Sequence, residues 1–170
     1  MQELINNVVK WGQERGLDKV GHEAQARKTL EETAELLEAY AKQDINAIND
    51  AIGDILVTLI VGASNDDDIL DAVEDHLVDE AFGYDEPFTK HDGDFDESYI
   101  DLLKDGLILM RDLACEVNYK ACIYCLDEAL AIINTDFNQH LSLQDCLKLA
   151  YNEIKNRTGK LVNGQFIKDN

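Results

Sequence analysis

The sequence predicts an all-α protein, a helical bundle with a short hairpin-like tail. Chain breakers are scarce, because the 170 residues include one proline and ten glycines. Hydrophobic residues make up 45% of the chain, which is typical of a folded globular protein. Several segments also repeat apolar residues every three or four positions, the period of an amphipathic helix. Together these observations favour helices through most of the chain.

Three helices are predicted in the N-terminal third. Residues 2–15 carry an apolar stripe, and Gly16 and Gly21 then mark a loop. A second helix is expected over residues 22–42. A third is expected over residues 45–62, whose second half, ILVTLIVGA, is apolar on all sides. A helix of that kind should be buried at the centre of the bundle.

The middle of the chain interrupts this pattern. Residues 65–101 contain fifteen Asp or Glu residues and a single Lys, which predicts a short acidic helix followed by a loop. Helical periodicity returns over residues 99–133, in two pieces. A last helix should begin after Ser142, an N-cap followed three residues later by Asp145. We expect this helix to end at Gly159.

The tail favours a two-stranded hairpin, because Asn163-Gly164 stands between two short alternating runs. We therefore expect one domain over residues 1–170. Its core would be residues 1–63 and 141–170, and residues 64–140 would be an inserted acidic, helical segment.

Charge and hydropathy limit the possible partners. A net charge of −20 repels a phosphate backbone, so we expect no nucleic-acid partner. No apolar run reaches the roughly 18–20 residues that cross a bilayer, and the N-terminus lacks a signal-peptide pattern. We expect a cytoplasmic protein without membrane attachment.

Five acidic residues on the second and third helices carry the functional interpretation. Glu31, Glu32 and Glu35 fall within an arc of about 100°, and Asp50 and Asp54 lie about 40° apart. The short connection makes the two helices antiparallel, so these groups can face one another. Asp54 directly precedes the apolar run, where burying an unpaired carboxylate costs several kcal/mol. A cation such as Mg²⁺, with Mn²⁺ as an alternative, would offset this cost; a solvated acidic face is the competing interpretation.

These residues lie in motifs that resemble a known family. "EETAE" and "DAIGDILVTL" are similar to EExxE and ExxD, the signature of the all-α, MazG-like nucleoside triphosphate pyrophosphohydrolases, a group that includes dimeric dUTPases and dCTPases. Residues 2–62 and 142–168 most resemble small phage-encoded members, which share "AYNEIKNRxGK" and "VNGxF". One position departs from the signature, because Ala51 replaces the glutamate of ExxD. Either Asp50 takes that role or the site lacks one ligand.

The resemblance implies an activity and a set of site residues. The activity is Mg²⁺-dependent hydrolysis of a nucleoside triphosphate to the monophosphate and pyrophosphate by a metal-activated water. The implied metal ligands are Glu32, Glu35, Asp50 and Asp54. Glu31, Glu32 and Glu35 form the implied catalytic set, in which Glu31 is either a further ligand or the group that orients the water. Family members form homodimers or homotetramers, and a phage-encoded member would work in the host cytoplasm.

A second set of residues is expected to hold the nucleotide. Residues 148–168 contain five Lys or Arg residues and one Glu, and such cations bind phosphate oxygens. The alternative is that the helix dipole alone favours basic residues at a helix C-terminus. Trp11 either stacks on a base or belongs to the core. The predicted substrate-binding residues are Trp11, Gln25, Lys28, Asn152, Lys155, Arg157 and Lys160.

A competing hypothesis rests on the acidic segment. A non-catalytic interaction protein on a degenerate pyrophosphohydrolase scaffold would explain both Ala51 and the acidic stretch, and its partner would be a basic protein. The three glutamates and Asp54 favour the enzyme.

Overall fold

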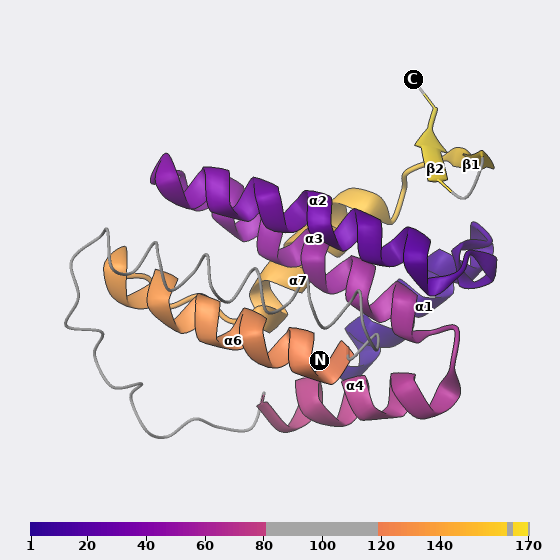
Figure 1. Ribbon diagram of the computed structural model, residues 1–170, viewed down its shortest axis with the longest axis horizontal. Coiled ribbons are helices and arrows are strands. Elements are labelled where there is room, and N and C mark those ends of the chain that lie inside the picture. The colour runs from indigo at the N-terminus through magenta and orange to yellow at the C-terminus, as the bar shows by residue number, and fades with distance from the viewer. Residues whose placement is uncertain (81–118, 163–164, 170) are drawn as a thin grey trace.

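The computed structural model describes residues 1–80, 119–162 and 165–169, and Figure 1 shows a mostly helical fold with one small hairpin. In chain order the described elements are α1 (Gln2–Glu14), the 3₁₀ helix η1 (Leu17–Lys19), α2 (His22–Ala41), α3 (Ile45–Ala63), α4 (Asp67–Glu80), α6 (Tyr119–Asp136), α7 (Leu143–Ile154), β1 (Gly159–Val162) and β2 (Gln165–Lys168). The predicted helical fold class is confirmed. The loop expected after the acidic helix, and the helical signal over residues 99–118, lie outside the described residues.

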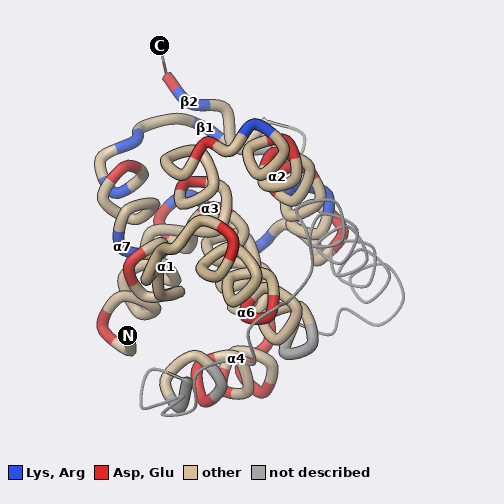
Figure 2. Tube along the Cα trace, turned by 90° about the vertical axis from the view of Figure 1, so that its left-hand side faces the viewer, with Lys and Arg blue, Asp and Glu red and all other residues tan. Residues whose placement is uncertain are grey.

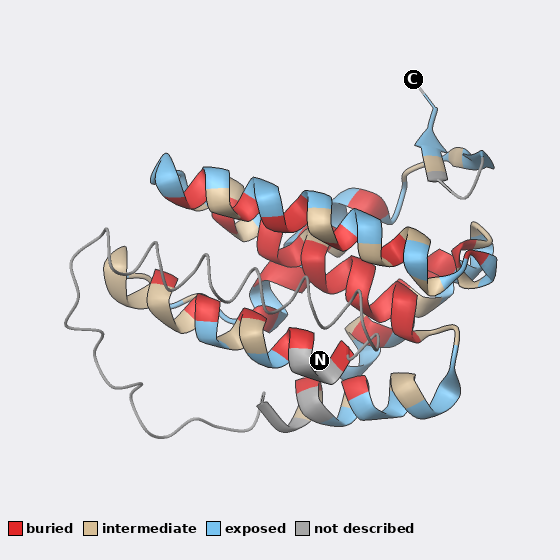
Figure 3. Ribbon diagram, in the orientation of Figure 1, coloured by how far each residue is buried: buried red, intermediate tan, exposed pale blue. Residues whose placement is uncertain are grey.

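The central helix is α3. All its residues from 55 to 63 are buried, and Figure 3 shows this part of α3 in red. α2 lies along one side of α3 and α7 along another, while α1, α4 and α6 also contact it. By length and composition alone α3 could cross a membrane, but 67% of its most apolar window is buried inside the structure. The predicted burial of this apolar run is therefore confirmed, as expected for the core helix of a bundle.

A tight turn joins α2 to α3. Gln43 adopts a left-handed conformation with φ of 57°. Asp44 then caps α3, because its side chain accepts hydrogen bonds from the backbone amides of Asn46 at 3.1 Å and Ala47 at 3.2 Å. The two helices are consequently antiparallel neighbours, and the N-terminal half of α2 lies beside the C-terminal half of α3.

Gly53 allows α7 to approach α3 closely. A Cβ atom at this position would lie 2.5 Å from the carbonyl oxygen of Cys146 and 2.8 Å from the Cβ of Ala150, which no larger residue tolerates without a shift of the backbone. This contact matters for function because Asp54 follows Gly53 directly. It brings the C-terminal end of α7 towards the acidic residues.

α7 ends earlier than the sequence predicts. Its last residue is Ile154, and Gly159 begins β1 instead of ending the helix. The physical reason is a set of hydrogen bonds to α1: Trp11 Nε1 donates to the Ile154 carbonyl at 2.9 Å, and Arg15 Nη2 donates to the Arg157 carbonyl at 2.6 Å. These bonds hold the chain on α1 where a longer helix would have continued.

The hairpin and α4 complete the described fold. β1 and β2 pair antiparallel, with Gly159 opposite Lys168, as the tail sequence predicts. α4 places Val73 and Leu77 fully buried in the same core as the other helices. Its acidic residues lie on the outside, where Figure 2 shows them along the helix. They include Asp67, Asp68, Asp71 and Asp75, all exposed.

Candidate functional site

A pocket of about 480 Å³ lies where α1, η1, α2, α3, α7 and the hairpin meet. One part of its wall is apolar and the other part is charged. The apolar lining includes Trp11, Leu17, Val57, Val61, Ile154 and Phe166. The charged lining includes Arg27, Lys28, Glu31, Glu32, Asp54, Arg157 and Lys168. A ligand that fills this pocket would therefore place an apolar ring system and a charged group side by side.

Asp54 is the most perturbed acid of the pocket. Burial raises its pKa to about 7, with further contributions from the negative charges of Glu32 and Asp50, while Arg157 acts in the opposite direction. Within the described residues Asp54 forms no ion pair. A half-buried carboxylate without a positive partner is a functional-site candidate, because a purely structural position would favour a neutral side chain.

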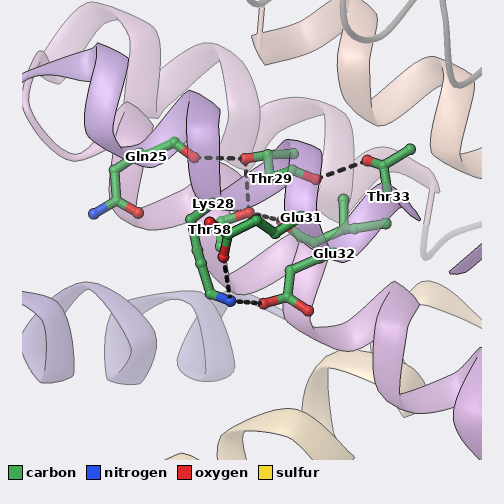
Figure 4. A network of polar contacts seen from close by, with 8 residues as sticks. Gln25, Lys28, Thr29, Glu31, Glu32, Thr33 and Thr58 are labelled. Atoms are coloured by element: carbon green, nitrogen blue, oxygen red, sulfur yellow. Dashed lines mark hydrogen bonds and ion pairs between the residues drawn. The ribbon is translucent and has the colours of Figure 1, made fainter. Parts of the chain in front are cut away.

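Glu32 faces Asp54 from α2 and is almost completely buried, with 4% of its surface exposed. Lys28 Nζ lies 2.6 Å from Glu32 Oε1 and 3.0 Å from Glu31 Oε2, so one ammonium group bridges both glutamates, as Figure 4 shows. Burial raises the pKa of Glu32 despite this attraction, and the nearby Glu35 carboxylate raises it further. For Lys28, burial would lower the pKa, but the hydrogen bonds to Glu32 and Glu31 raise it overall.

The remaining predicted acids lie at the edge of this cluster. Glu35 is exposed and does not line the pocket, but it is close enough to Glu32 to affect its pKa. Asp50 is also on the surface; partial burial and Glu153 raise its pKa. Ala51 is buried in the core with 4% exposed and offers no oxygen. The structure therefore brings Glu31, Glu32 and Asp54 into the pocket itself.

The donor chemistry of this cluster fits a hard divalent cation. All the candidate ligands are carboxylate oxygens, which Mg²⁺ prefers. The pKa of Asp54 is raised first by burial and then by the negative charges of Glu32 and Asp50, and a bound cation would offset both effects. In the part of the chain that the structure describes, however, no three Asp, Glu, His or Cys side chains converge closely enough to hold one ion. Glu31 and Glu32 are bound by Lys28 instead.

A chain of hydroxyl groups connects α2 to α3 behind the acids. Thr29 Oγ1 lies 2.8 Å from Thr58 Oγ1, and it also donates to the Gln25 carbonyl at 3.0 Å. The Gln25 side chain lines the pocket with only 7% of the residue exposed. Among the described residues its carboxamide has no hydrogen-bond partner, and Figure 4 shows it pointing away from the threonines. It is thus available to donate to and accept from a ligand.

The aromatic wall is rigid. Besides the hydrogen bond to Ile154, Trp11 packs edge-on against Phe166 with ring centroids 5.9 Å apart, and the Arg15 guanidinium stacks 4.7 Å from its ring. Trp11 is buried, with 8% exposed, and it also lines the pocket. Trp11 therefore belongs to the core and also lines the pocket, while its stacking on a base stays a prediction.

The predicted basic residues separate into two groups. Arg157 lines the pocket, and its guanidinium pairs with Glu153. Lys155, which donates to Asn152 at 2.7 Å, is exposed and lies outside the lining, as do Asn152 and Lys160. Lys155 and Lys160 follow the end of α7, where the chain turns towards the hairpin, whereas Asn152 is exposed on α7 itself.

The sequence did not single out every lining residue, and Arg27, Phe166 and Lys168 are among those missed. Arg27 lies next to Lys28, while Phe166 and Lys168 reach the pocket from β2. Lys168 was counted in the basic segment, so charge was its only signal. Phe166 appeared only as the last residue of the VNGxF motif, and its place in the wall depends on contact with Trp11, a residue far away in the chain.

Comparison with known protein families shows that residues 20–76 match the model of the MazG nucleotide pyrophosphohydrolase domain. The matched segment contains both acid-bearing helices, α2 and α3, and extends into α4. Searches of curated proteins and of solved structures found no match.

Proposed function

We propose, from the MazG nucleotide pyrophosphohydrolase domain formed by residues 20–76, that this chain hydrolyses a nucleoside triphosphate to the monophosphate and pyrophosphate. The observation that carries the proposal is the half-buried Asp54, facing the buried Glu32 at the edge of a pocket with an apolar wall. Such a pocket suits a nucleotide, which combines a flat ring system with a polyanionic tail.

Carboxylates alone cannot bind a triphosphate, because both are negative. A bound Mg²⁺ or Mn²⁺ would neutralise the phosphates and lower the pKa of an attacking water. Glu32 and Asp54 are the first candidates to hold the cation, and Glu35 and Asp50 extend the oxygen donors at the edge of the cluster. Glu31 is more exposed than Glu32, and in this proposal it orients the water and accepts its proton.

The other pocket residues supply binding and orientation. Arg157 and Lys168 bring positive charge opposite the acids of α2 and α3, where they would contact phosphate oxygens. The apolar wall around Trp11 and Phe166 would pack against the base, and the Gln25 carboxamide would hydrogen-bond to its edge. Exclusion of water by the apolar wall strengthens each of these polar contacts.

The test is pyrophosphate release from a panel of ribonucleoside and deoxyribonucleoside triphosphates in Mg²⁺. We expect at least one triphosphate to be hydrolysed. Glu32→Gln and Glu35→Gln should reduce turnover, with the larger loss, at least about a hundredfold, for the pocket residue Glu32. Glu38→Gln is the matched control on the same helix, because Glu38 is exposed and pairs with Lys42 outside the pocket. Its turnover should match that of the unmodified protein.

Absence of turnover on every triphosphate would overturn the enzyme proposal. If the same preparation bound a basic protein, and did so equally well with Glu32→Gln, the acidic interaction protein would be the better description. The exposed acids of α4 would then be the surface to mutate first.

A further inference from the structure

A role in nucleotide binding alone does not explain the position of Lys28. Its ammonium group lies between the carboxylates of Glu31 and Glu32, inside the pocket, at 3.0 and 2.6 Å. The side chain of Lys28 is half exposed, with 50% accessible, whereas that of Glu32 is only 6% accessible. A half-exposed cation is thus bound to a buried anion.

This pair differs from the other helical ion pairs of α2. Arg27 pairs with Glu23 and Lys42 with Glu38, and all four of these side chains are at least 64% exposed. Pairs of that kind contribute little to stability, because water screens both charges. Glu32, in contrast, lies against Asp54 and raises its pKa, so the charge that Lys28 balances belongs to the acidic cluster of the pocket.

We propose that the Lys28 ammonium is the resident counter-ion of this cluster: it competes with the divalent cation for Glu32, and once displaced it binds the nucleotide phosphates. The inference rests on the proposed function for the second half of that statement only. The first half, competition between Lys28 and the divalent cation, follows from the positive charge of Lys28 and from its position at the carboxylates. Lys28 holds the same carboxylate oxygens that a cation would need, and a positive group beside them repels a second one.

The displaced side chain has a defined alternative partner. A lysine side chain carries a compact charge on a flexible four-carbon chain, so its ammonium group can move between partners. Lys28 also lines the pocket in which the phosphates would lie. Binding of the divalent cation would release the Lys28 ammonium, which could then bind the phosphates of the nucleotide. Metal and nucleotide would then bind in a favoured order, with the metal weakening the ion pair that restrains Lys28.

The first experiment measures Mn²⁺ binding by electron paramagnetic resonance, without nucleotide. Lys28→Met removes the charge and keeps the length of the side chain, and we expect the Kd for Mn²⁺ to fall about five- to tenfold. Lys28→Gln should give a similar decrease, which guards against a folding defect specific to one variant. Unchanged or weaker Mn²⁺ binding in both variants would overturn the proposal.

Arg27→Met is the matched control. Arg27 lines the same pocket and carries the same charge one residue away, but its ion pair is with Glu23. If Lys28 acted only through its net charge, Arg27→Met would tighten Mn²⁺ binding to a similar extent. A Kd within twofold of the unmodified protein is expected, and an equal gain in both variants would overturn direct competition.

The second experiment tests release towards the phosphates. A non-hydrolysable α,β-methylene triphosphate is titrated in saturating Ca²⁺ by calorimetry, using whichever base the panel identifies. Lys28→Met should weaken its binding about tenfold, and equal binding would overturn this half of the inference. Tighter Mn²⁺ binding by Lys28→Met in a protein that hydrolyses no triphosphate would support the counter-ion role while the proposed function fails. The two ideas can therefore be separated.

Discussion

The two halves of α2, divided here after Thr33, bury different chemistry along one helix. The N-terminal half faces the pocket and the C-terminal half faces the core. The buried residues of the first half are Gln25, Thr29, Glu32 and Thr33, and those of the second half are Leu36, Ala39 and Tyr40. Burying an apolar side chain is favourable, whereas burying a polar or charged group costs free energy unless it is fully paired.

The contrast shows that the N-terminal half of α2, at the candidate site, contributes less to the stability of the fold than the C-terminal half. In the first half Glu32 keeps a raised pKa even with Lys28 bound to it, and Asp54 opposite has no ion-pair partner among the described residues. In the second half Tyr40 is fully buried and packs against Phe137 with ring centroids 5.2 Å apart. The apolar half holds the hairpin of α2 and α3 together, so the polar half can retain charges that a purely structural bundle would not keep.

Replacing Asp54, the acid without an ion-pair partner among the described residues, should have the largest effect on activity. We expect Asp54→Asn to lower the rate of pyrophosphate release at least about a thousandfold, because it removes a charged oxygen donor from the centre of the cluster. Its melting temperature in EDTA at pH 8 should be equal to or higher than that of the unmodified protein, because repulsion with Glu32 and Asp50 disappears. Asp71→Asn, on the exposed face of α4, is the control for both measurements. An Asp54→Asn protein that unfolds in EDTA would make Asp54 a structural residue.

The apolar half should respond in the opposite way. Leu36→Ala removes a side chain that is 3% exposed, and we expect a loss of about 2–4 kcal/mol in the free energy of unfolding by urea. Turnover well below the melting temperature should stay within about threefold of normal, because Leu36 does not line the pocket. A large loss of activity in a still-folded protein would show that the two halves are not separate in function.

A smaller effect should appear in the pH dependence of stability. The pKa of Asp54 is about 7 in the folded protein, against an ordinary value of 3.8. Between these values the folded state retains a proton that the unfolded state has released, so stability falls as the pH rises through this window. From pH 6 to pH 8 the expected loss is about 1 kcal/mol, measured by urea unfolding in EDTA. Asp54→Asn should lose this part of the slope; an unchanged slope would assign it to another group, such as Glu32, whose pKa is also raised.

Helix positions could be predicted because local signals and core packing agree. The apolar run of α3, the Asp44 cap and the Gly16 loop each appear in the sequence within a few residues of the feature that they determine. Asp54 could also be identified, because a carboxylate at the start of a buried apolar run is unusual. The spacing of Lys28 and Glu32, four residues apart on a helix, contained the signal for their ion pair.

The rest depends on contacts between distant parts of the chain. The end of α7 could not be placed, because the Ile154 carbonyl accepts its hydrogen bond from Trp11, 143 residues away. The same contact determines which basic residues reach the pocket: Arg157 and Lys168 do, whereas Lys155 and Lys160 do not. Periodicity and charge describe a helix face, but they contain no information on how a hairpin packs against α1.

The hydrogen bonds from α1 to the end of α7 have a consequence for biosynthesis. Trp11 and Arg15 need the carbonyls of Ile154 and Arg157, and the side chain of Phe166 must follow to complete the wall. A ribosome-bound chain that has emerged only as far as α3 already contains Glu31, Glu32 and Asp54. It still lacks the part of the pocket wall that Ile154, Arg157 and Phe166 form. Under the proposed function, hydrolysis would therefore begin only after these two distant segments have met, and an incomplete chain would leave triphosphates intact.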